Sequence, residues 1–198
     1  AAALTSQGKV SGTILFGQTG IPVPVPKAAP MLPPWVDLSY NYASWQANGF
    51  GTQLTWPVSL GCRIGDASST TPSGVLYPWY QQLKNLSSPT VIDARGCASV
   101  SGNIALSLKT DVAFIGTNFD FDSINLTSGD AAIHKIWFIV PDAQPTVAGP
   151  QCTKKGGNFV VNTTSSVSTN VDAFVYAPCS IAINNGTTWT GQLYSGDM

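Results

Sequence analysis

Short apolar runs separated by turn residues dominate the pattern of the chain from Thr90 onward. One set, "DVAFIG" from Asp111, "KIWFIVPD" from Lys135 and "DAFVYAPC" from Asp172, has about four apolar residues before a Gly or Pro turn. A second set, "NIALSL", "SINLTS" and "SIAINN", has an Ile-x-Leu or Ile-x-Ile core framed by Asn and Ser. Runs of this length between turn residues predict β-strands.

Some of these runs recur after about 20 residues: 24 positions separate Asp111 from Lys135, and 19 separate Asp172 from Gly191. Such periods with short strands are typical of a parallel β-solenoid. In that fold each strand pairs with the strand one coil away, and inward Val, Ile, Leu and Phe side chains form a continuous core. Asn and Gly occupy the corners, where left-handed backbone angles occur, as expected for "NNG" at Asn184. A β-sandwich remains the alternative, since it also uses short strands and Gly or Asn turns.

The last apolar runs lie in "FVYAPCSIAINNGTTWTGQLYSG", from Phe174 to Gly196. None is long enough to form a stable hairpin alone. We therefore expect them to be successive faces of the last coil, packed on strands in "KIWFIVPD" and "NFVVN".

The first half of the chain has a different pattern. Residues 1–34 hold a first short strand, Val10 to Phe16, and a Pro-rich extended crossing, because proline interrupts helices and central strands. Residues 35–89 are expected to form an irregular, disulfide-tied cap or insertion. It would contain helical turns over Ser39–Asn48 and Trp79–Leu86, with a strand in "TQLTWPVSLGC". The solenoid coils would then occupy residues 90–198.

Composition supports an all-β class. Charged residues make up 10% of the chain, against about 25% in typical soluble domains, and glutamate, a strong helix former, is absent. The formal net charge of -1 and the lack of a basic cluster beyond Lys154-Lys155 give no strong nucleic-acid signature. The chain has no apolar run of about 18 residues, so no membrane span is predicted.

Four cysteines, Cys62, Cys97, Cys152 and Cys179, are spaced without any Cys-x-x-Cys pair, which disfavours zinc. Their even number favours disulfides and an extracellular, cell-surface location. Three pairings are open. We favour Cys62–Cys97 and Cys152–Cys179, because each closes a moderate loop within its own region.

Catalytic chemistry has few candidates. His134 is the single histidine, so a Ser-His-Asp triad would have to use it, but the chain has no Gly-x-Ser-x-Gly elbow. We expect a strand-edge histidine bonded to neighbouring backbone. Asp93 and Arg95 in "VIDARGC" are interpreted as a structural salt bridge or turn. No catalytic residue is assigned, and the chain is predicted not to be an enzyme.

The best candidate for an ion site is the acidic cluster Asp120, Asp122 and Asp130. In "DFDSINLTSGD" an extended backbone places Asp120 and Asp122 on one face, where carboxylates could hold Ca²⁺. The spacing of an EF-hand is missing, so solvated acids on a loop are the favoured interpretation. Apart from this possible calcium, no cofactor is expected.

The chain holds six tryptophans, of which Trp45, Trp56 and Trp79 are candidates for ligand binding. Exposed Trp and Tyr side chains stack on sugars and anchor interfaces, whereas buried ones would fill the seam between the cap and the coils. Burial is the favoured interpretation.

"HKIWFIVPD" and "FVYAPCSIAINNGTTWTGQLYSG", with "VIDARGC" and "TDVAFIG" upstream, resemble a widespread domain of bacterial cell-surface proteins that is abundant in actinobacteria. Members of that family usually begin with a type IV pilin-like helix and continue into a β-solenoid. The resemblance covers about Thr90 to Gly196 and implies a right-handed solenoid. It brings no catalytic residues with it, and the pilin-like helix does not occur in this sequence.

The expected function is that of a non-enzymatic extracellular surface module. It would be the ectodomain of an adhesive protein or of a pilus-associated one, such as a minor or tip pilin-like subunit. Its partners would be other pilus or cell-surface subunits, or a host or surface ligand. Two alternatives stay open: a carbohydrate-binding or carbohydrate-active β-solenoid protein, and a DNA-capturing minor pilin, which the net charge of -1 disfavours.

Overall fold

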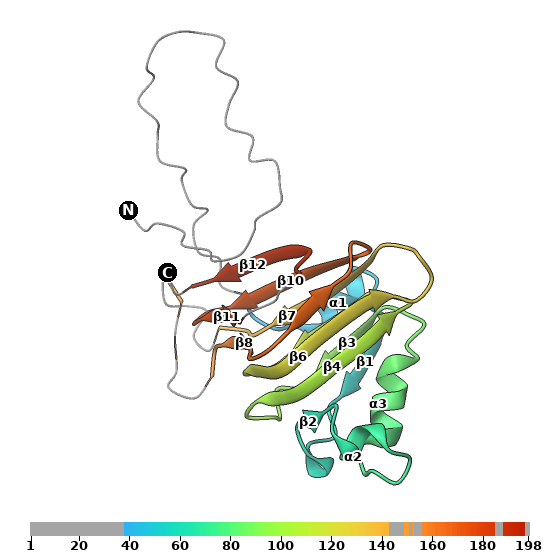
Figure 1. The fold of residues 1–198 in the computed structure, drawn as a ribbon. Helices are drawn as coiled ribbons and strands as arrows, with labels where there is room; N and C mark the ends of the chain where they lie inside the picture. The colour runs from blue at the N-terminus through green and yellow to red at the C-terminus, as the bar shows by residue number, and fades with distance from the viewer. Residues whose placement is uncertain (1–37, 143–148, 151, 153–155, 185–187, 197–198) are drawn as a thin grey trace, which may run out of the picture. The chain divides into compact units, whose positions relative to one another are not determined.

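The computed structural model describes residues 38–142, 149–150, 152, 156–184 and 188–196 (Figure 1). The chain divides into two units, residues 1–35 and 36–198, and every described residue belongs to the second. The predicted strand Val10 to Phe16 and the Pro-rich crossing fall outside the described residues.

In chain order the elements are α1 (Tyr42–Ala47), β1 (Thr52–Thr55), the 3-10 helix η1 (Val58–Leu60), β2 (Arg63–Ile64), α2 (Ala67–Thr70), α3 (Tyr77–Lys84), β3 (Thr90–Asp93), β4 (Val100–Leu108), β5 (Val112–Ile115), β6 (Phe119–Ser128), β7 (His134–Ile139), β8 (Phe159–Val161), β9 (Ser165–Val167), β10 (Val171–Ala177), β11 (Ile181–Ile183) and β12 (Gly191–Ser195).

The described strands form two parallel sheets, which lie as two layers in Figure 1. The first sheet has the order β1-β3-β5-β7-β10-β12, and the second has β11-β8-β6-β4-β2 with β9 on β6. Apart from β8 and β9, which follow one another in the second sheet and both pair with β6, the chain passes alternately from one sheet to the other, and successive strands in a sheet are neighbours. Every strand pair among the described residues is parallel, whereas a β-sandwich of the immunoglobulin kind is antiparallel. The all-β class is confirmed, and the sandwich alternative does not fit this pairing.

The core lies between the two sheets and is built from aromatic side chains in register. On the first sheet, Phe114 and Phe138 are cross-strand partners whose rings stack at 5.4 Å. On the second, Phe119 and Phe159 are partners with ring centroids 6.1 Å apart. Phe138 also contacts Phe119 at 5.6 Å. All four are fully buried, so the layers are joined by direct aromatic packing.

A β-bulge on β6 explains a change of phase in its sequence. Inward positions are Phe119 and Phe121 before the bulge and Ile124 and Leu126 after it. Asp122 is the extra residue, since the register with β4 shifts at this point. A bulge turns every following side chain to the other face, which keeps both apolar pairs in the core.

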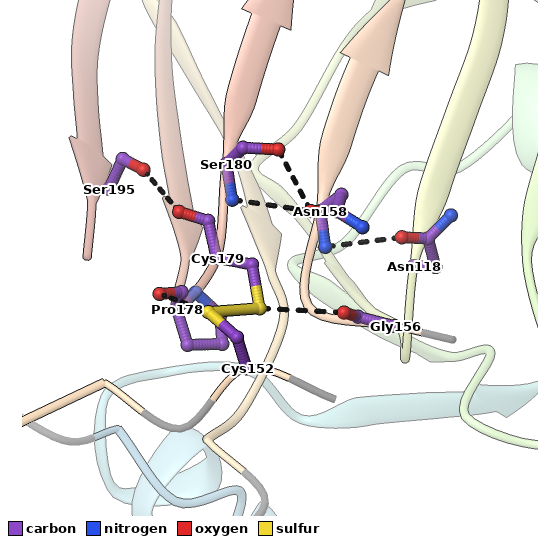
Figure 2. Close-up of a disulfide and its surroundings, with 8 residues drawn as sticks. All are labelled: Asn118, Cys152, Gly156, Asn158, Pro178, Cys179, Ser180 and Ser195. Carbon is purple, nitrogen blue, oxygen red and sulfur yellow. Dashed lines mark hydrogen bonds between the residues drawn. A yellow bond between two sulfur atoms is a disulfide. The ribbon is translucent and has the colours of Figure 1, made fainter. Parts of the chain in front are cut away.

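Polar side chains form a ladder at the corner where the chain enters the second sheet. Ser99, Asn118, Asn158 and Ser180 each immediately precede a strand of that sheet. Asn118 Nδ2 donates to Ser99 Oγ at 3.0 Å, and the Asn158 amide donates to Asn118 Oδ1 at 3.1 Å. Ser180 Oγ donates to Asn158 Oδ1 at 2.8 Å (Figure 2). The ladder satisfies corner groups that would otherwise lack partners and links successive strands of the second sheet.

Residues 35–89, predicted as a cap or insertion, contribute strands to both sheets. β1 pairs with β3 from Thr52 to Thr55, and β2 pairs with β4 through Arg63 and Ile64. The parallel sheets therefore begin before Thr90, where the coils were predicted to start. Both predicted helices are present, as α1 and α3. In α1, the Asn41 side chain accepts the Ala43 amide at 2.9 Å, an N-cap that fixes where the helix begins.

One end of the core is covered by the segment from Trp56 to Leu86. Trp56, Tyr80 and Leu83 are buried in the main core cluster. α3 carries Tyr80 and Leu83 on one face, a spacing of three that places both toward the sheets. The Cys62–Cys97 disulfide ties this segment to the corner that follows β3.

The outward faces of the two sheets differ. The second sheet presents short polar side chains on β4 and β6, such as Ser107, Asn125 and Thr127, which are exposed. The first sheet presents apolar outward side chains on its middle strands, and Ile115 and Tyr176 are buried there. Residues 38–50 cover part of this face. The Leu38 amide donates to the Tyr176 hydroxyl at 3.1 Å.

Candidate ligand-binding site

Aromatic side chains gather on the outward face of the first sheet. Trp137 on β7 points outward, because its neighbours Ile136 and Phe138 point into the core. Phe174 on β10 is its register partner, and Gln192 on β12 is the next residue in that row. Trp137 and Phe174 are half-buried, and Gln192 is exposed.

Two further rings pack against this row from the segment that contains α1. Trp45 and Phe50 contact Trp137 with centroids at 5.9 Å and 5.5 Å, and they contact each other at 5.0 Å. All three pairs are close to perpendicular. The Phe50 amide donates to the Trp45 carbonyl oxygen at 3.1 Å, which closes the turn after α1 and holds both rings over β7. We call Trp45, Phe50, Trp137 and Phe174 the aromatic patch.

Two neighbouring depressions share Lys135 and Trp137. One has a volume of about 430 Å³ and lies over β7, β10 and β12. The other, of about 400 Å³, lies between α1 and β7. Both volumes fall within the range of small-molecule sites, about 300–1,000 Å³. The residues that line them are Lys135, Trp137, Asp172, Ala173, Phe174, Gly191 and Gln192 for the first, and Ser44, Trp45, Asn48, Phe50, Asp111, Lys135 and Trp137 for the second.

A row of charged side chains borders the aromatic patch. Lys135 and Asp172 are register partners on β7 and β10, and Asp111 lies on the other side, just before β5. The Lys135 amide donates to Asp111 Oδ1 at 2.8 Å. Within the described part of the chain, the Lys135 ammonium forms no ion pair with either carboxylate. Its three donors are therefore available to a ligand.

This arrangement combines apolar ring surface with hydrogen-bonding groups on a rigid sheet. Lys135 supplies donors, Asp172 supplies acceptors, and the amides of Gln192 and Asn48 supply both. Ligand sites combine these elements: apolar and aromatic walls with a few placed polar groups. The arrangement therefore offers groups that can bind a ligand.

A second polar cluster lies further along the same face. Arg95 donates to both carboxylate oxygens of Asp93, at 2.9 Å and 2.8 Å, and lies 4.3 Å from the centre of the Tyr40 ring. The hydrogen bond from Arg95 holds the pKa of Asp93 below its usual value. Burial, followed by the charge of Asp93, raises the pKa of Tyr40. The salt bridge predicted from "VIDARGC" is present, and its contacts anchor Tyr40 to the corner after β3.

The three tryptophans that the sequence offered as candidate ligand contacts are separated by the fold. Trp45 belongs to the aromatic patch. Trp56 is buried, with Nε1 donating to the Gly61 carbonyl oxygen at 2.9 Å. Trp79 on α3 is half-buried and contacts Trp56 at 5.9 Å. Trp56 and Trp79 thus lie where the cap meets the sheets, as expected for buried tryptophans.

The acidic cluster is not brought together. Asp120 and Asp122 share the outward side of β6, as expected, but each has a donor: Asn162 for Asp120 at 2.8 Å, and Arg63 for Asp122. Asp130 lies beyond the end of β6 and accepts from His134. Among the described residues no three His, Cys, Asp or Glu side chains are grouped to hold a metal. Calcium binding therefore gains no support from this arrangement.

His134 is a buried residue at the start of β7. Its Nε2 lies 2.7 Å from Asp130 Oδ1, so its side-chain partner is a carboxylate and not the backbone that we expected. The hydrogen bond from His134, and then the one from the Ala132 amide, lower the pKa of Asp130. In a Ser-His-Asp triad the serine hydroxyl is bonded to the imidazole. Here Ser128 Oγ contacts Asp130 and not the imidazole, so these three residues do not form a triad.

The four cysteines form two disulfides, Cys62–Cys97 and Cys152–Cys179, which is the pairing that the sequence favoured. Figure 2 shows the second bond beside the corner ladder. The Cys179 amide donates to the Gly157 carbonyl oxygen at 2.9 Å, which joins the backbone just before β11 to the backbone just before β8.

Sequence reasoning missed Trp137, Phe174 and Lys135. They lie in runs that are apolar on both faces, so the outward positions do not stand out from the inward ones. A usable signal is the recurrence of a charged residue two positions before an aromatic one, Lys135 with Trp137 and Asp172 with Phe174. Equal spacing on paired strands places both charges and both rings on one face.

In the part of the chain that the structure describes, no helix is long and apolar enough to cross a membrane. Comparisons with protein-family models, with curated proteins and with solved structures found no match. The resemblance to cell-surface proteins of actinobacteria therefore stays a prediction.

Proposed function

We propose that this chain is a right-handed β-solenoid module that acts outside the cell by binding, as part of a pilus-associated or adhesive surface protein. The parallel pairing of successive strands in two sheets supports the solenoid. Right-handedness follows from the general preference of parallel crossovers, about 98% of which are right-handed. A stack of this kind holds a surface rigidly, which suits display.

Two disulfide bonds are compatible with an extracellular location, because such bonds form and persist in oxidising compartments. The module's partners would be pilus or cell-surface subunits, or a ligand on a host or other surface. A DNA-capturing role is less favoured, since the formal net charge is -1 and the candidate site carries two carboxylates for one lysine.

The observation that carries the proposal is the pair of depressions around Trp137 on a rigid sheet, with the ammonium of Lys135 free of ion pairs within the described residues. An outward tryptophan is an anchor of high contact area, and binding energy concentrates at such residues. Polar groups around it lend specificity.

Bead adhesion tests the proposal. Protein secreted by an oxidising host is checked by mass for two disulfides and coupled to fluorescent beads. Retention is then counted on whole cells, cell-wall material and purified extracellular proteins, against beads that carry heat-denatured protein. We expect retention on at least one surface. Retention on none of them, or a saturable hydrolysis of polysaccharide or ester that is lost in His134→Ala, would contradict the proposal.

A further inference from the structure

We propose that the aromatic patch and its bordering charges bind a neutral glycan built of pyranose rings, with Trp137 as the central stacking residue. This inference rests on the proposed binding function and names the chemical class of its ligand. It is carried by three observations: the position of the rings, the type of polar group around them, and the sum of their charges.

The rings supply the apolar surface that a sugar ring needs. A pyranose has faces of C–H groups, which pack on aromatic rings, and hydroxyls around its rim. Trp137 lines both depressions, so a chain of two or more sugar units can run from one to the other across the indole. Trp45 and Phe50 hold that indole from the α1 side, which reduces the side-chain entropy lost on binding.

The polar groups match the rim of a sugar. Hydroxyls both donate and accept, so a carboxylate next to a donor can bond to adjacent hydroxyls of one ring. Asp172 and Lys135 are register partners and face outward beside Phe174, and Gln192 adds an amide on the next strand. Asn48 and Ser44 offer the same chemistry in the other depression.

Charge selects neutral over acidic glycans. Lys135 is the single cation among the lining residues named for the two depressions, and Asp111 and Asp172 are two anions. The formal charge of the site is thus -1 at neutral pH. A uronate, sulfate or phosphate on the ligand would meet carboxylates on both sides of the lysine, which disfavours binding.

Titration calorimetry with neutral hexasaccharides tests the inference. The probes are cellohexaose, mannohexaose, xylohexaose and chitohexaose, with hexagalacturonate as the acidic comparison. We expect at least one neutral probe to bind and the acidic one to bind about tenfold more weakly or not at all. Trp137→Ala should weaken binding by about tenfold, and Gln192→Ala by about threefold. Lys84→Ala removes an equally exposed lysine on α3 and should leave affinity unchanged.

Circular dichroism shows whether Trp137→Ala folds. If it does not, Lys135→Ala and Gln192→Ala decide, because both side chains are exposed and their loss leaves the core intact. Binding of no neutral probe, preference for the acidic probe, or affinity unchanged in the folded site variants would overturn the inference. If beads are still retained after periodate treatment of the surface, the proposed binding function would stand, but its ligand would not be a glycan.

Discussion

The Tyr80 hydroxyl is bonded twice to one residue: it donates to the Ala105 carbonyl oxygen at 3.1 Å and accepts the Ala105 amide at 3.2 Å. β4 runs from Val100 to Leu108, but β2 pairs with it only through Ser101 and Gly102. Beyond that point β4 is not paired with β2. A side chain from α3 therefore takes the place of a strand partner and blocks an edge that could otherwise pair with another chain.

Tyr80→Phe should lower the free energy of unfolding by about 1–2 kcal/mol, because two hydrogen bonds to backbone are lost while the ring stays in place. Urea denaturation monitored by circular dichroism measures the difference. Tyr77→Phe is the matched control, since Tyr77 lies on the same helix and is only half-buried. Equal effects from the two substitutions would show that the hydroxyl of Tyr80 contributes nothing specific.

Gly102→Ala should destabilise the protein by about 2–4 kcal/mol. Gly102 has a φ of 100°, which side-chain-bearing residues rarely adopt, and a Cβ there would run into the Ile64 backbone carbonyl. Gly51→Ala is the control, because no heavy atom lies within 4 Å of a Cβ at that position. Thermal unfolding of both variants measures the contrast, and a mild effect at Gly102 would mean that β2 can move away from β4.

Loss of the Cys62–Cys97 disulfide should cost about 3–4 kcal/mol, the loop-closure entropy expected when 35 positions separate the cysteines. The double substitution Cys62→Ala and Cys97→Ala removes the bond without leaving a free thiol from the pair. Its melting temperature should fall clearly below that of the oxidised protein. A double variant as stable as the oxidised protein would show that the cap is held by packing of Trp56 and Tyr80 alone.

The strands of the sheets could largely be predicted from the sequence, because each run of β-branched and aromatic residues ends at a turn residue. Val112–Ile115 lies within its predicted run, and His134–Ile139 and Val171–Ala177 each begin one residue before theirs. The cap was harder. β2 has two residues, and its pairing with β4 depends on tertiary contacts that leave no periodic signal.

The candidate site could be predicted only in part. Trp45 was named as a candidate ligand contact, although burial was favoured for it. Its partner Trp137 comes from a strand in which both faces are apolar, so the direction of the Trp137 side chain was open. That direction depends on register, which the sequence pattern specifies weakly where neither face is polar. The bulge at Asp122 was also missed, although the change of phase between Phe121 and Ile124 is visible in the sequence.

Asp93 gives the protein a pH-dependent contribution to stability. The hydrogen bond from Arg95 holds its folded-state pKa below the ordinary value of 3.8. The contribution is therefore fully present above about pH 4 and is lost as the pH falls through the lowered pKa. Asp93→Asn should lower the free energy of unfolding by about 1 kcal/mol at pH 7, because the Asp93–Arg95 pair is partly exposed. The loss should be smaller at pH 2.5. Chemical denaturation at both pH values measures this. A cost of Asp93→Asn that is equal at both pH values would mean that the contribution of Asp93 does not come from the ionised carboxylate.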